Sequence, residues 1–484
     1  MLKFVNIQKK LPTKEKSNSR IGNFNEIYSE YSKDKAEEQA SRCSQCGIPF
    51  CQVHCPLHNN IPDWLKLAAE NRLEEAYELS NLTNNMPEVC GRICPQDRLC
   101  EGNCVIEKSG HGTVTIGSIE KYITDFAWKE GWVKPINVSS EKDYSIGIIG
   151  SGPAGLAAAE ELRKKGYKVI IYDRYDRAGG LLIYGIPNFK LEKEIVQKRI
   201  KRLINSGIIF KLNCEIGKDI SFNEIKNKHD AVLIATGVYQ PKEIDLNHKN
   251  LSNVVPALNF LIASNKKGLN DLVPEFDNGN LNSLNKNVVV IGGGDTAMDC
   301  VRTAVRQGAK SVKCLYRRDQ QNMPGSQREV HNAIEEGIDF NWLTLPKEYI
   351  GNGKVTETKF VRMQLGSVDD SGRRKPEPIE GSDEKFKSDL VIEAIGFDPE
   401  NLPQIFENQQ LKINRSGTLK IDLNTMMTSI EGVFAAGDIV RGASLVVWGI
   451  KDGRDAASNI DQYLMSKTIP ANKSTYQSVE LNNV

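Results

Sequence analysis

The strongest constraint on the fold is one continuous segment, SIGIIGSGPAGLAAAEELRKKGYKVIIYD, at residues 145–173. Its pattern predicts a strand, a glycine turn, an amphipathic helix and a second strand, which together make a βαβ unit. Gly150, Gly152 and Gly155 form a G-x-G-x-x-G motif directly after the first strand. Such glycines permit a tight turn, room for a pyrophosphate, and close packing of helix on strand. The segment therefore predicts an α/β fold that binds a dinucleotide.

Other parts of the chain indicate which dinucleotide this unit binds. Asp173 ends the second strand, where a carboxylate can hold a ribose hydroxyl. Thr236 and Gly237 end the strand AVLIATG, and Gly437 and Asp438 follow much later in GVFAAGDIV. This arrangement resembles flavoproteins with two dinucleotide-binding domains, in which the later Gly-Asp pair lies beside the ribityl chain of FAD. The resemblance implies that the first unit binds FAD and that residues after about 390 complete it.

A second glycine motif lies in NVVVIGGGDTAMDCVRTAVRQGAKSVKCLYRR. Its site residues are Gly292, Gly294, Asp295 and Ala297, again between a predicted strand and a predicted helix. The next strand ends in Arg317 and Arg318 and carries no carboxylate at the ribose position. A carboxylate would repel a 2′-phosphate, whereas arginine binds phosphate well, so NADPH is favoured over NADH. The alternative is that both arginines form an ordinary solvated strand end.

Eight of the eleven cysteines fall between Cys43 and Cys104, in two quartets. Short spacings let thiolates converge on an iron–sulfur cluster, and a reducing cytoplasm favours metal binding over disulfides. Structural zinc is the alternative, although only Cys43 and Cys46 have the C-x2-C spacing typical of zinc knuckles. No close cysteine pair follows residue 104, so a reduced flavin has no redox disulfide to pass electrons to. The quartets are the expected electron exit.

Composition narrows the class of protein. The 484 residues include 63 Lys and Arg against 62 Asp and Glu, which argues against nucleic acid or an anionic membrane as main partner. No run approaches the length of a membrane helix, and the polar N-terminus lacks the apolar core of a secretory signal. We expect a soluble, cytoplasmic protein.

The expected fold class is α/β, with a helical iron–sulfur domain followed by two Rossmann-like domains, the second inserted in the first. The expected domains are residues 1–143 for the clusters, 144–285 for FAD, 286–389 for NADPH, and 390–484 for the rest of the FAD domain and a C-terminal tail. Asn/Lys-rich stretches at 240–250 and 264–287 look like connections, and residues 366–386 look like an exposed hairpin. The tail after about residue 465 is polar and is expected to be loosely held.

Several longer motifs resemble one family closely. They include RCSQCGIPFCQVHCPLHNNIPDWLKL, NNMPEVCGRICPQDRLCEGNC, GGLLIYGIPNFKL and VVWGIKDGRDAA, and Gly180 of the third motif is expected to bind the FAD cofactor. Together they resemble the small-subunit family of bacterial NADPH-dependent glutamate synthases over about residues 3–465. The wider family includes the large subunit of a bifurcating NADPH–ferredoxin oxidoreductase and the N-terminal half of dihydropyrimidine dehydrogenase.

The resemblance implies two interleaved 4Fe–4S clusters. One would be held by Cys43, Cys46, Cys51 and Cys104. The other would be held by Cys55, Cys94, Cys100 and a carboxylate, Glu120, which leaves Cys90 spare. The alternative of one intact quartet per cluster, with Cys90 as a ligand, stays open.

The resemblance also implies the reaction. NADPH would pass hydride to FAD, and two clusters would relay electrons to a large subunit that carries FMN and an iron–sulfur cluster and makes glutamate from glutamine and 2-oxoglutarate. No side-chain acid or base is needed, so no catalytic residue is predicted. Two alternatives remain: an NADPH–ferredoxin-type oxidoreductase subunit, and a flavoprotein whose cysteine domain is a zinc docking module.

Overall fold

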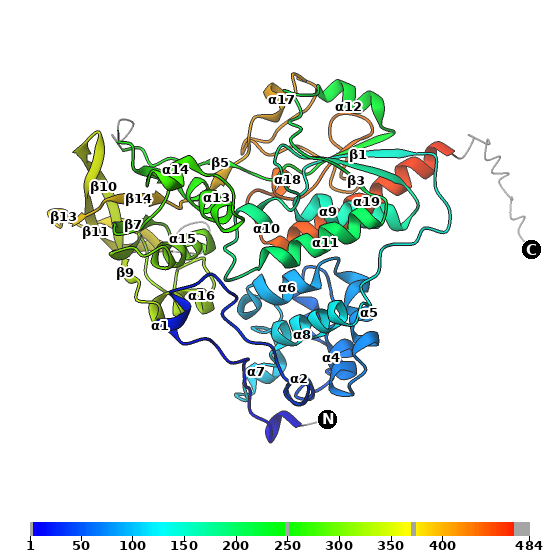
Figure 1. The fold of residues 1–484 in the computed structure, drawn as a ribbon, viewed down its shortest axis with the longest axis horizontal. Helices are drawn as coiled ribbons and strands as arrows, with labels where there is room; N and C mark the ends of the chain where they lie inside the picture. The colour runs from blue at the N-terminus through cyan, green and yellow to red at the C-terminus, as the bar shows by residue number, and fades with distance from the viewer. Residues whose placement is uncertain (1–2, 247–250, 369–373, 469–484) are drawn as a thin grey trace, which may run out of the picture.

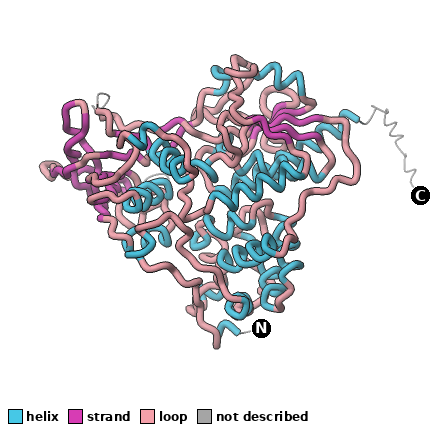
Figure 2. The backbone as a smooth tube through the Cα atoms, viewed as in Figure 1, coloured by secondary structure: helices cyan, strands magenta, loops and turns pink. Residues whose placement is uncertain are grey.

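The computed structural model describes residues 3–246, 251–368 and 374–468 (Figure 1). Two groups of strands lie apart from each other, and a third region consists of helices and loops (Figure 2). The predicted C-terminal tail lies mostly outside the described residues. Among the described residues, no helix combines the length and the apolar composition that a bilayer crossing requires.

The N-terminal region contains helices and loops, as the sequence predicts. Its helices are α1 (Ser17–Arg20), α2 (Lys33–Ala40), α3 (Phe50–Val53), α4 (Ile61–Ala69), α5 (Leu73–Thr83), α6 (Pro87–Ile93), α7 (Val105–Lys108) and α8 (Ile116–Lys129), with 3-10 turns at Lys3–Val5 and Gln96–Arg98. Trp64 on α4 and Ile119 and Ile123 on α8 are fully buried in the core of this domain. Burial of these large apolar side chains stabilises a domain whose helices are mostly short.

The first Rossmann-like unit has a five-stranded parallel sheet in the order β16-β4-β1-β2-β3. The strands are β1 (Ser145–Ile149), β2 (Lys168–Tyr172), β3 (Ile209–Lys211), β4 (Ala231–Ile234) and β16 (Val433–Ala435). Its helices are α9 (Pro153–Lys164), α10 (Leu181–Tyr184), α11 (Lys193–Asn205), α12 (Phe222–Lys228), α17 (Leu402–Ile405), α18 (Asp438–Arg441) and α19 (Val446–Thr468). Because β16 pairs with β4 from far along the chain, the unit is discontinuous, as expected.

The second Rossmann-like unit also has a five-stranded parallel sheet, in the order β6-β14-β7-β8-β9. The strands are β6 (Val254–Pro256), β7 (Asn287–Ile291), β8 (Ser311–Tyr316), β9 (Asp339–Trp342) and β14 (Leu390–Glu393). The helices are α13 (Ala257–Gly268), α14 (Pro274–Asp277), α15 (Asp295–Arg306) and α16 (Gln327–Glu335). The unit thus starts before residue 286 and ends after residue 389, because β6 and β14 flank the predicted range and pair with each other.

Two smaller groups of strands complete the fold. An antiparallel group is formed by β10 (Thr344–Asn352), β11 (Lys354–Val368), β12 (Arg374–Pro378) and β13 (Glu384–Lys387). The predicted hairpin at 366–386 falls in this group, except that residues 369–373 lie outside the described residues. The pair β5 (Gln240–Pro241) and β15 (Phe397–Asp398) lies where the chain passes between the two Rossmann-like units. The predicted connection at 264–287 is only partly a loop, since α13 extends to Gly268 and α14 follows.

The N-terminal helical domain and the first Rossmann-like unit share one core. Leu57, Met86 and Val89 pack in the same apolar cluster as the buried faces of α9 and α19. Glu88 on α6 also makes a buried ion pair with Arg199 on α11, at 2.7 Å between Oε1 and Nε. A shared core and a buried, bidentate ion pair fix the two domains relative to each other.

Candidate functional site

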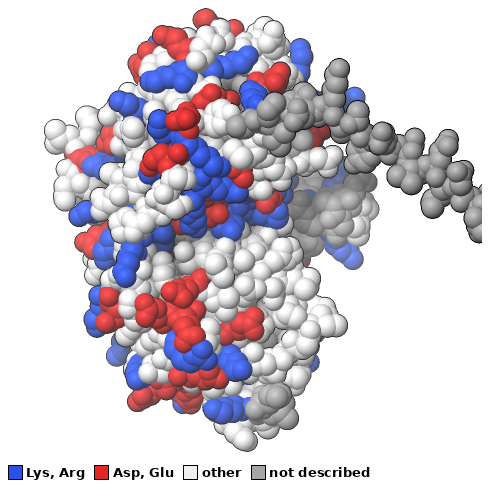
Figure 3. All heavy atoms as spheres, turned by 90° about the vertical axis from the view of Figure 1, so that its right-hand side faces the viewer, with Lys and Arg blue, Asp and Glu red and all other residues white. Residues whose placement is uncertain are grey.

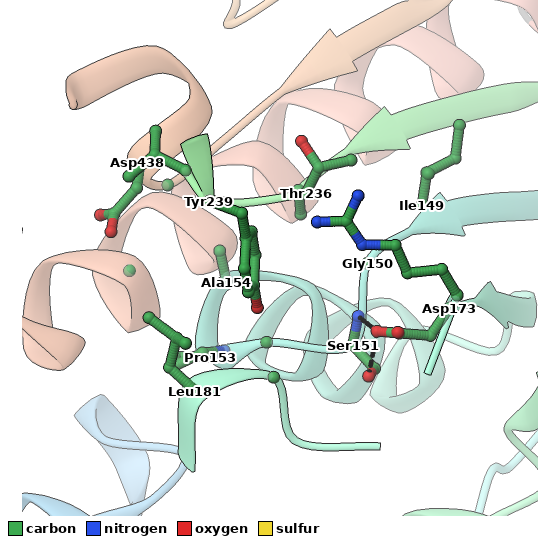
Figure 4. A pocket seen from close by; sticks show the side chains of 18 of the residues that line it. Ile149, Gly150, Ser151, Pro153, Ala154, Asp173, Leu181, Thr236, Tyr239 and Asp438 are labelled. Carbon is green, nitrogen blue, oxygen red and sulfur yellow. Dashed lines mark hydrogen bonds between the residues drawn. The ribbon is translucent and has the colours of Figure 1, made fainter. Parts of the chain in front are cut away.

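A pocket lies at the carboxyl ends of the strands in the first sheet. This edge is where parallel α/β sheets bind ligands. The pocket is lined by most of the residues predicted to bind FAD, namely Gly150, Gly152, Asp173, Gly180, Thr236, Gly237, Gly437 and Asp438. Residues from both halves of the discontinuous unit therefore meet in one pocket (Figure 4).

The three glycines of the first motif differ in what surrounds them. A Cβ atom on Gly150 would lie 2.3 Å from the carbonyl oxygen of Ala235, and one on Gly155 would lie 2.1 Å from that of Gly150. A Cβ atom on Gly152 would meet nothing within 4 Å. Gly150 and Gly155 are thus required for close packing, whereas Gly152 keeps space open beside the N-terminus of α9. That space fits the pyrophosphate of a dinucleotide.

Asp173 lies in this pocket and also holds the glycine turn. Its Oδ2 accepts a hydrogen bond from the backbone N–H of Ser151 at 2.7 Å and another from the Ser151 hydroxyl (Figure 4). Its Oδ1 accepts from the backbone N–H of Tyr175 at 2.9 Å. Each carboxylate oxygen can accept more than one hydrogen bond, so these contacts are compatible with a further one to a ribose hydroxyl.

Two tyrosines and an arginine that line the pocket were not predicted from the sequence. The Arg174 guanidinium lies 4.9 Å from the ring centre of Tyr239 and 5.4 Å from that of Tyr175. Arg174 also pairs with Glu400 at 2.8 Å. Cys214 is half-buried and lines the same pocket. None of these residues belongs to a motif, and only the fold brings them together.

Asp438 lies at the opposite end of the pocket from Asp173 (Figure 4). Burial raises the pKa of Asp438 to about 6, although a hydrogen bond from the Ser444 hydroxyl opposes the shift. The adjacent Gly437 has φ of 77°, a conformation that favours glycine. This end of the pocket therefore offers a half-buried carboxyl group that can hydrogen-bond a ligand hydroxyl.

The second glycine motif repeats the geometry of the first. A Cβ atom on Gly292 would lie 2.2 Å from the carbonyl oxygen of Ala394, whereas one on Gly294 would meet nothing within 4 Å. Ala297 is fully buried on α15 and supports the turn by packing. Asp295 accepts a hydrogen bond from the backbone N–H of Ser326 at 2.9 Å. The open space beside Gly294, at the N-terminus of α15, fits a second dinucleotide.

The two predicted arginines at the end of β8 have different surroundings. Arg317 is exposed, which leaves its guanidinium accessible to a ligand phosphate. Arg318 is only 6% exposed, and its Nε donates to the backbone carbonyl of Arg374 at 3.0 Å. This bond joins the end of β8 to β12. The alternative of an ordinary solvated strand end therefore fits Arg317 but not Arg318.

A loop after β8 covers the second glycine turn. The backbone N–H of Gly325 donates to the carbonyl oxygen of Gly293 at 3.0 Å. The iron–sulfur domain reaches the same place, because Arg98 donates to the carbonyl of Pro324 and lies 3.5 Å from Asp295. Glu329 is buried and paired with Arg302. The second glycine turn thus lies where the N-terminal domain meets the second Rossmann-like unit.

Two cavities in the N-terminal domain are lined by cysteines. The first is lined by Cys43, Cys46, Cys51 and Cys104. The second is lined by Cys55, Cys90, Cys94, Cys100 and Glu120. The structure therefore groups Cys104 with the first quartet and Cys55 with the second, in the interleaved way that the resemblance implies. His54 and His58 are exposed and line neither cavity.

The chemistry of these side chains fits iron–sulfur clusters. Burial raises the pKa of the Cys43 and Cys55 thiols to about 11, so holding them as thiolates requires nearby positive charge such as iron. Burial raises the pKa of Glu120 to about 8, and a hydrogen bond from Asn84 opposes that shift. Among the described residues, no group of His, Cys, Asp or Glu converges closely enough to hold a single metal ion.

Two family models match the chain. Residues 20–132 match a model described as dihydropyrimidine dehydrogenase domain II, 4Fe–4S cluster. Residues 144–453 match the pyridine nucleotide-disulphide oxidoreductase model. The first match favours iron and sulfide over zinc in the cysteine cavities, and the second covers both Rossmann-like units.

Curated relatives extend the similarity over almost the whole chain. The chain is 60% identical to the NADPH glutamate synthase small chain of Azospirillum brasilense over 467 residues, covering 96% of this chain and 97% of the relative. It is 46% identical to the Escherichia coli K12 protein of the same name, covering 95% and 98%. The solved structure of Mycobacterium tuberculosis FprA in complex with NADPH is 21% identical, with a TM-score of 0.57 over 68% of this chain and 86% of FprA. That likeness concerns the fold alone.

Proposed function

Because the chain belongs to the family of NADPH-dependent glutamate synthase small chains, we propose that it is the electron-input subunit of such a synthase. Bound NADPH and FAD supply hydride transfer, and iron–sulfur clusters supply one-electron transfer. The protein contributes position and electrostatics, and no side chain is required as an acid or base. We propose that Gly152, Asp173 and Asp438 hold FAD, and that Gly294 and Arg317 hold NADPH.

The observation that carries this proposal is the arrangement of three cavities in sequence. Val446, the first residue of α19, lines the FAD pocket, and the next residue, Val447, lines the second cysteine cavity. Ile116 then lines both cysteine cavities. Groups held in neighbouring cavities lie close enough to exchange electrons. The expected order is therefore FAD pocket, second cavity, first cavity.

Of the two cysteine cavities, the first is the closer to solvent. Its Cys43, Cys46 and Cys51 are half-buried, whereas Cys90, Cys94 and Cys100 of the second cavity are buried. We infer that electrons leave the chain from the first cavity to a large subunit, in which FMN and a further iron–sulfur cluster complete glutamate synthesis. We also propose a cytoplasmic location, where the eleven free cysteines would stay reduced.

The proposal predicts a partial activity for the isolated chain. With NADPH it should reduce artificial electron acceptors, but it should form no glutamate from glutamine and 2-oxoglutarate. Added large subunit should restore glutamate formation. Glutamate made by the purified chain alone would contradict the proposal, and so would a failure to oxidise NADPH when FAD is bound.

A further inference from the structure

Two side chains are candidates for the fourth cluster ligand in the second cysteine cavity. Cys90 and Glu120 both line it, together with Cys55, Cys94 and Cys100. Both are buried, at 4% and 7% exposure. The amides of two asparagines, Asn59 and Asn84, also line this cavity and contact these side chains.

The orientation of the Asn59 amide is fixed by a group that can only donate. The Trp64 indole N–H donates to Asn59 Oδ1 at 3.3 Å, and the Thr83 hydroxyl donates to the same oxygen at 3.0 Å. Asn59 Nδ2 must therefore point the other way. It donates to Glu120 Oε1 at 3.2 Å.

The Asn84 amide is fixed in the same manner. The backbone N–H of Met86 donates to Asn84 Oδ1 at 3.0 Å, so Nδ2 faces Glu120 and donates to Oε1 at 3.2 Å. The Cys90 sulfur lies 3.7 Å from the same Oδ1, as the donor of a weak S–H bond. The Asn84 amide thus contacts both candidate ligands. Its Nδ2 donates to the Glu120 carboxylate, and its Oδ1 accepts from the Cys90 thiol.

From this geometry we propose that Asn59 and Asn84 are positioning residues for the second cluster. Their two N–H groups hold Oε1 of Glu120, so that Oε2, to which no described residue hydrogen-bonds, is presented as the fourth ligand. The carbonyl of Asn84 accepts from the Cys90 thiol and so directs its sulfur away from the fourth ligand position. Outer hydrogen bonds of this kind orient ligands and tune the potential of a metal centre. The inference rests on the proposed function, because it requires a cluster in this cavity.

The alternative is that the two asparagines only satisfy a buried carboxyl group. Such a role would affect folding stability but would leave the properties of the second cluster unchanged. A test therefore needs a readout of the cluster itself and a control variant that has a similar effect on stability.

The test uses the full chain, purified anaerobically, with iron analysis and an EPR-monitored redox titration. Asn84→Ser keeps a hydroxyl that can accept from the Met86 N–H but removes the donor to Glu120. Asn59→Ala removes the other donor. The control is Asn85→Ala, because Asn85 is fully buried but bonds Glu161 and Arg454 instead of Glu120.

We expect Asn84→Ser and Asn59→Ala each to lower the midpoint potential of one cluster, because a carboxylate with fewer hydrogen bonds donates more electron density to iron. The other cluster should be unchanged. Cys90→Ala should keep the full iron content and both EPR signals, whereas Glu120→Ala should alter the same signal as the asparagine variants. Asn85→Ala should lower thermal stability only.

Two results would overturn the inference. One is loss of a cluster signal in Cys90→Ala. The other is asparagine variants whose potentials match those of wild type and Asn85→Ala. If the asparagine variants do not fold, Cys90→Ala and Glu120→Ala still decide which side chain is the ligand. Absence of iron from the wild-type chain would instead contradict the proposed function, so the two failures are distinguishable.

Discussion

Gly152 and Gly294 occupy equivalent places in the two Rossmann-like units, and neither has an atom within 4 Å of an added Cβ. An alanine at either position should fold normally yet obstruct a ligand. We expect Gly152→Ala to lose FAD and Gly294→Ala to keep FAD but to bind NADPH at least tenfold more weakly. Flavin absorbance after purification and NADPH titration would measure this.

Each of these variants is the control for the other, since the substitution is the same and only the cofactor site differs. Measured without bound cofactors, the unfolding temperatures of the two variants should match that of the wild-type protein without cofactors. A Gly152→Ala protein that retains FAD would show that the space beside α9 is not the pyrophosphate site.

His229 should make the stability of the protein depend on pH. It is 7% exposed and lies between the Tyr172 hydroxyl, 3.0 Å from Nε2, and the Ser145 hydroxyl, 2.6 Å from Nδ1. Burial, with a smaller contribution from Lys228, lowers the pKa of His229 to about 4. In the unfolded chain His229 gains a proton as the pH falls through about 6.5, whereas in the folded chain it stays neutral until the pH nears 4. Stability present above pH 6.5 is therefore lost as pH falls towards 4.

The loss could reach about 3 kcal/mol, from roughly 1.4 kcal/mol for each unit of pKa difference. In His229→Gln the free energy of unfolding should fall less steeply between pH 7 and pH 4.5. The matched control is His331→Gln, because His331 is exposed on α16. Equal slopes in wild type and His229→Gln, measured by urea unfolding, would contradict the prediction.

The site residues differ in how far the sequence could predict them. Gly150, Gly152, Gly292 and Gly294 belong to motifs, so their places in the two glycine turns follow from spacing alone. The distant carbonyl groups against which Gly150 and Gly292 pack do not. The Nε of Arg318, a predicted nucleotide-binding residue, donates to the backbone of β12, a strand more than 50 residues later in the chain. Contacts at that separation depend on how the antiparallel strands pack, and no pattern near Arg318 indicates them.

At the scale of elements, α15 and α16 are joined to the N-terminal segment by a buried charge cluster. Glu336 accepts hydrogen bonds from Arg20, Arg302 and Arg306, at 2.7, 2.9 and 2.7 Å. Burial raises the pKa of Glu336, but hydrogen bonds from Arg306 and Arg302 outweigh it and bring the pKa to about 2. The carboxylate is therefore charged at neutral pH and neutralises part of a buried cluster of three guanidinium groups.

Glu336→Gln should leave these guanidinium groups without their shared counter-ion and destabilise the protein by about 3–5 kcal/mol. Residues 14–28, which include Arg20, should then be cut faster in limited proteolysis. Glu335→Gln is the control, because its side chain is 45% exposed and its pairs with Lys14 and Arg20 should contribute about 1 kcal/mol or less. Equal unfolding midpoints for the two variants would contradict this account.

The sequence predicted the βαβ elements well and their boundaries less well. β1, α9 and β2 follow from a continuous apolar run, a glycine turn and helical spacing. β6 is only three residues long and lies beside an Asn/Lys-rich stretch, so its place in the second sheet was not visible. It is a strand because its neighbour β14 pairs with it, which is a tertiary effect that local propensity does not encode.

At the scale of the whole molecule, three domains meet around the cofactor cavities. The face in Figure 3 carries both basic and acidic side chains, in keeping with a net charge of only +1 for the chain. The family resemblance predicted how the cysteines interleave, and the cavities group them in that way. The order of the cavities could not be predicted, because it depends on how α19 packs between the FAD pocket and the iron–sulfur domain.

The central claim is that electrons pass from NADPH through FAD to two 4Fe–4S clusters within this chain. The most direct test is iron, sulfide and zinc content of anaerobically purified protein, with visible and EPR spectra before and after NADPH. The account predicts about eight irons with matching sulfide, a flavin that bleaches, and reduced-cluster EPR signals. Zinc in place of iron, or a flavin that bleaches while iron-loaded clusters cannot be reduced through it, would contradict it.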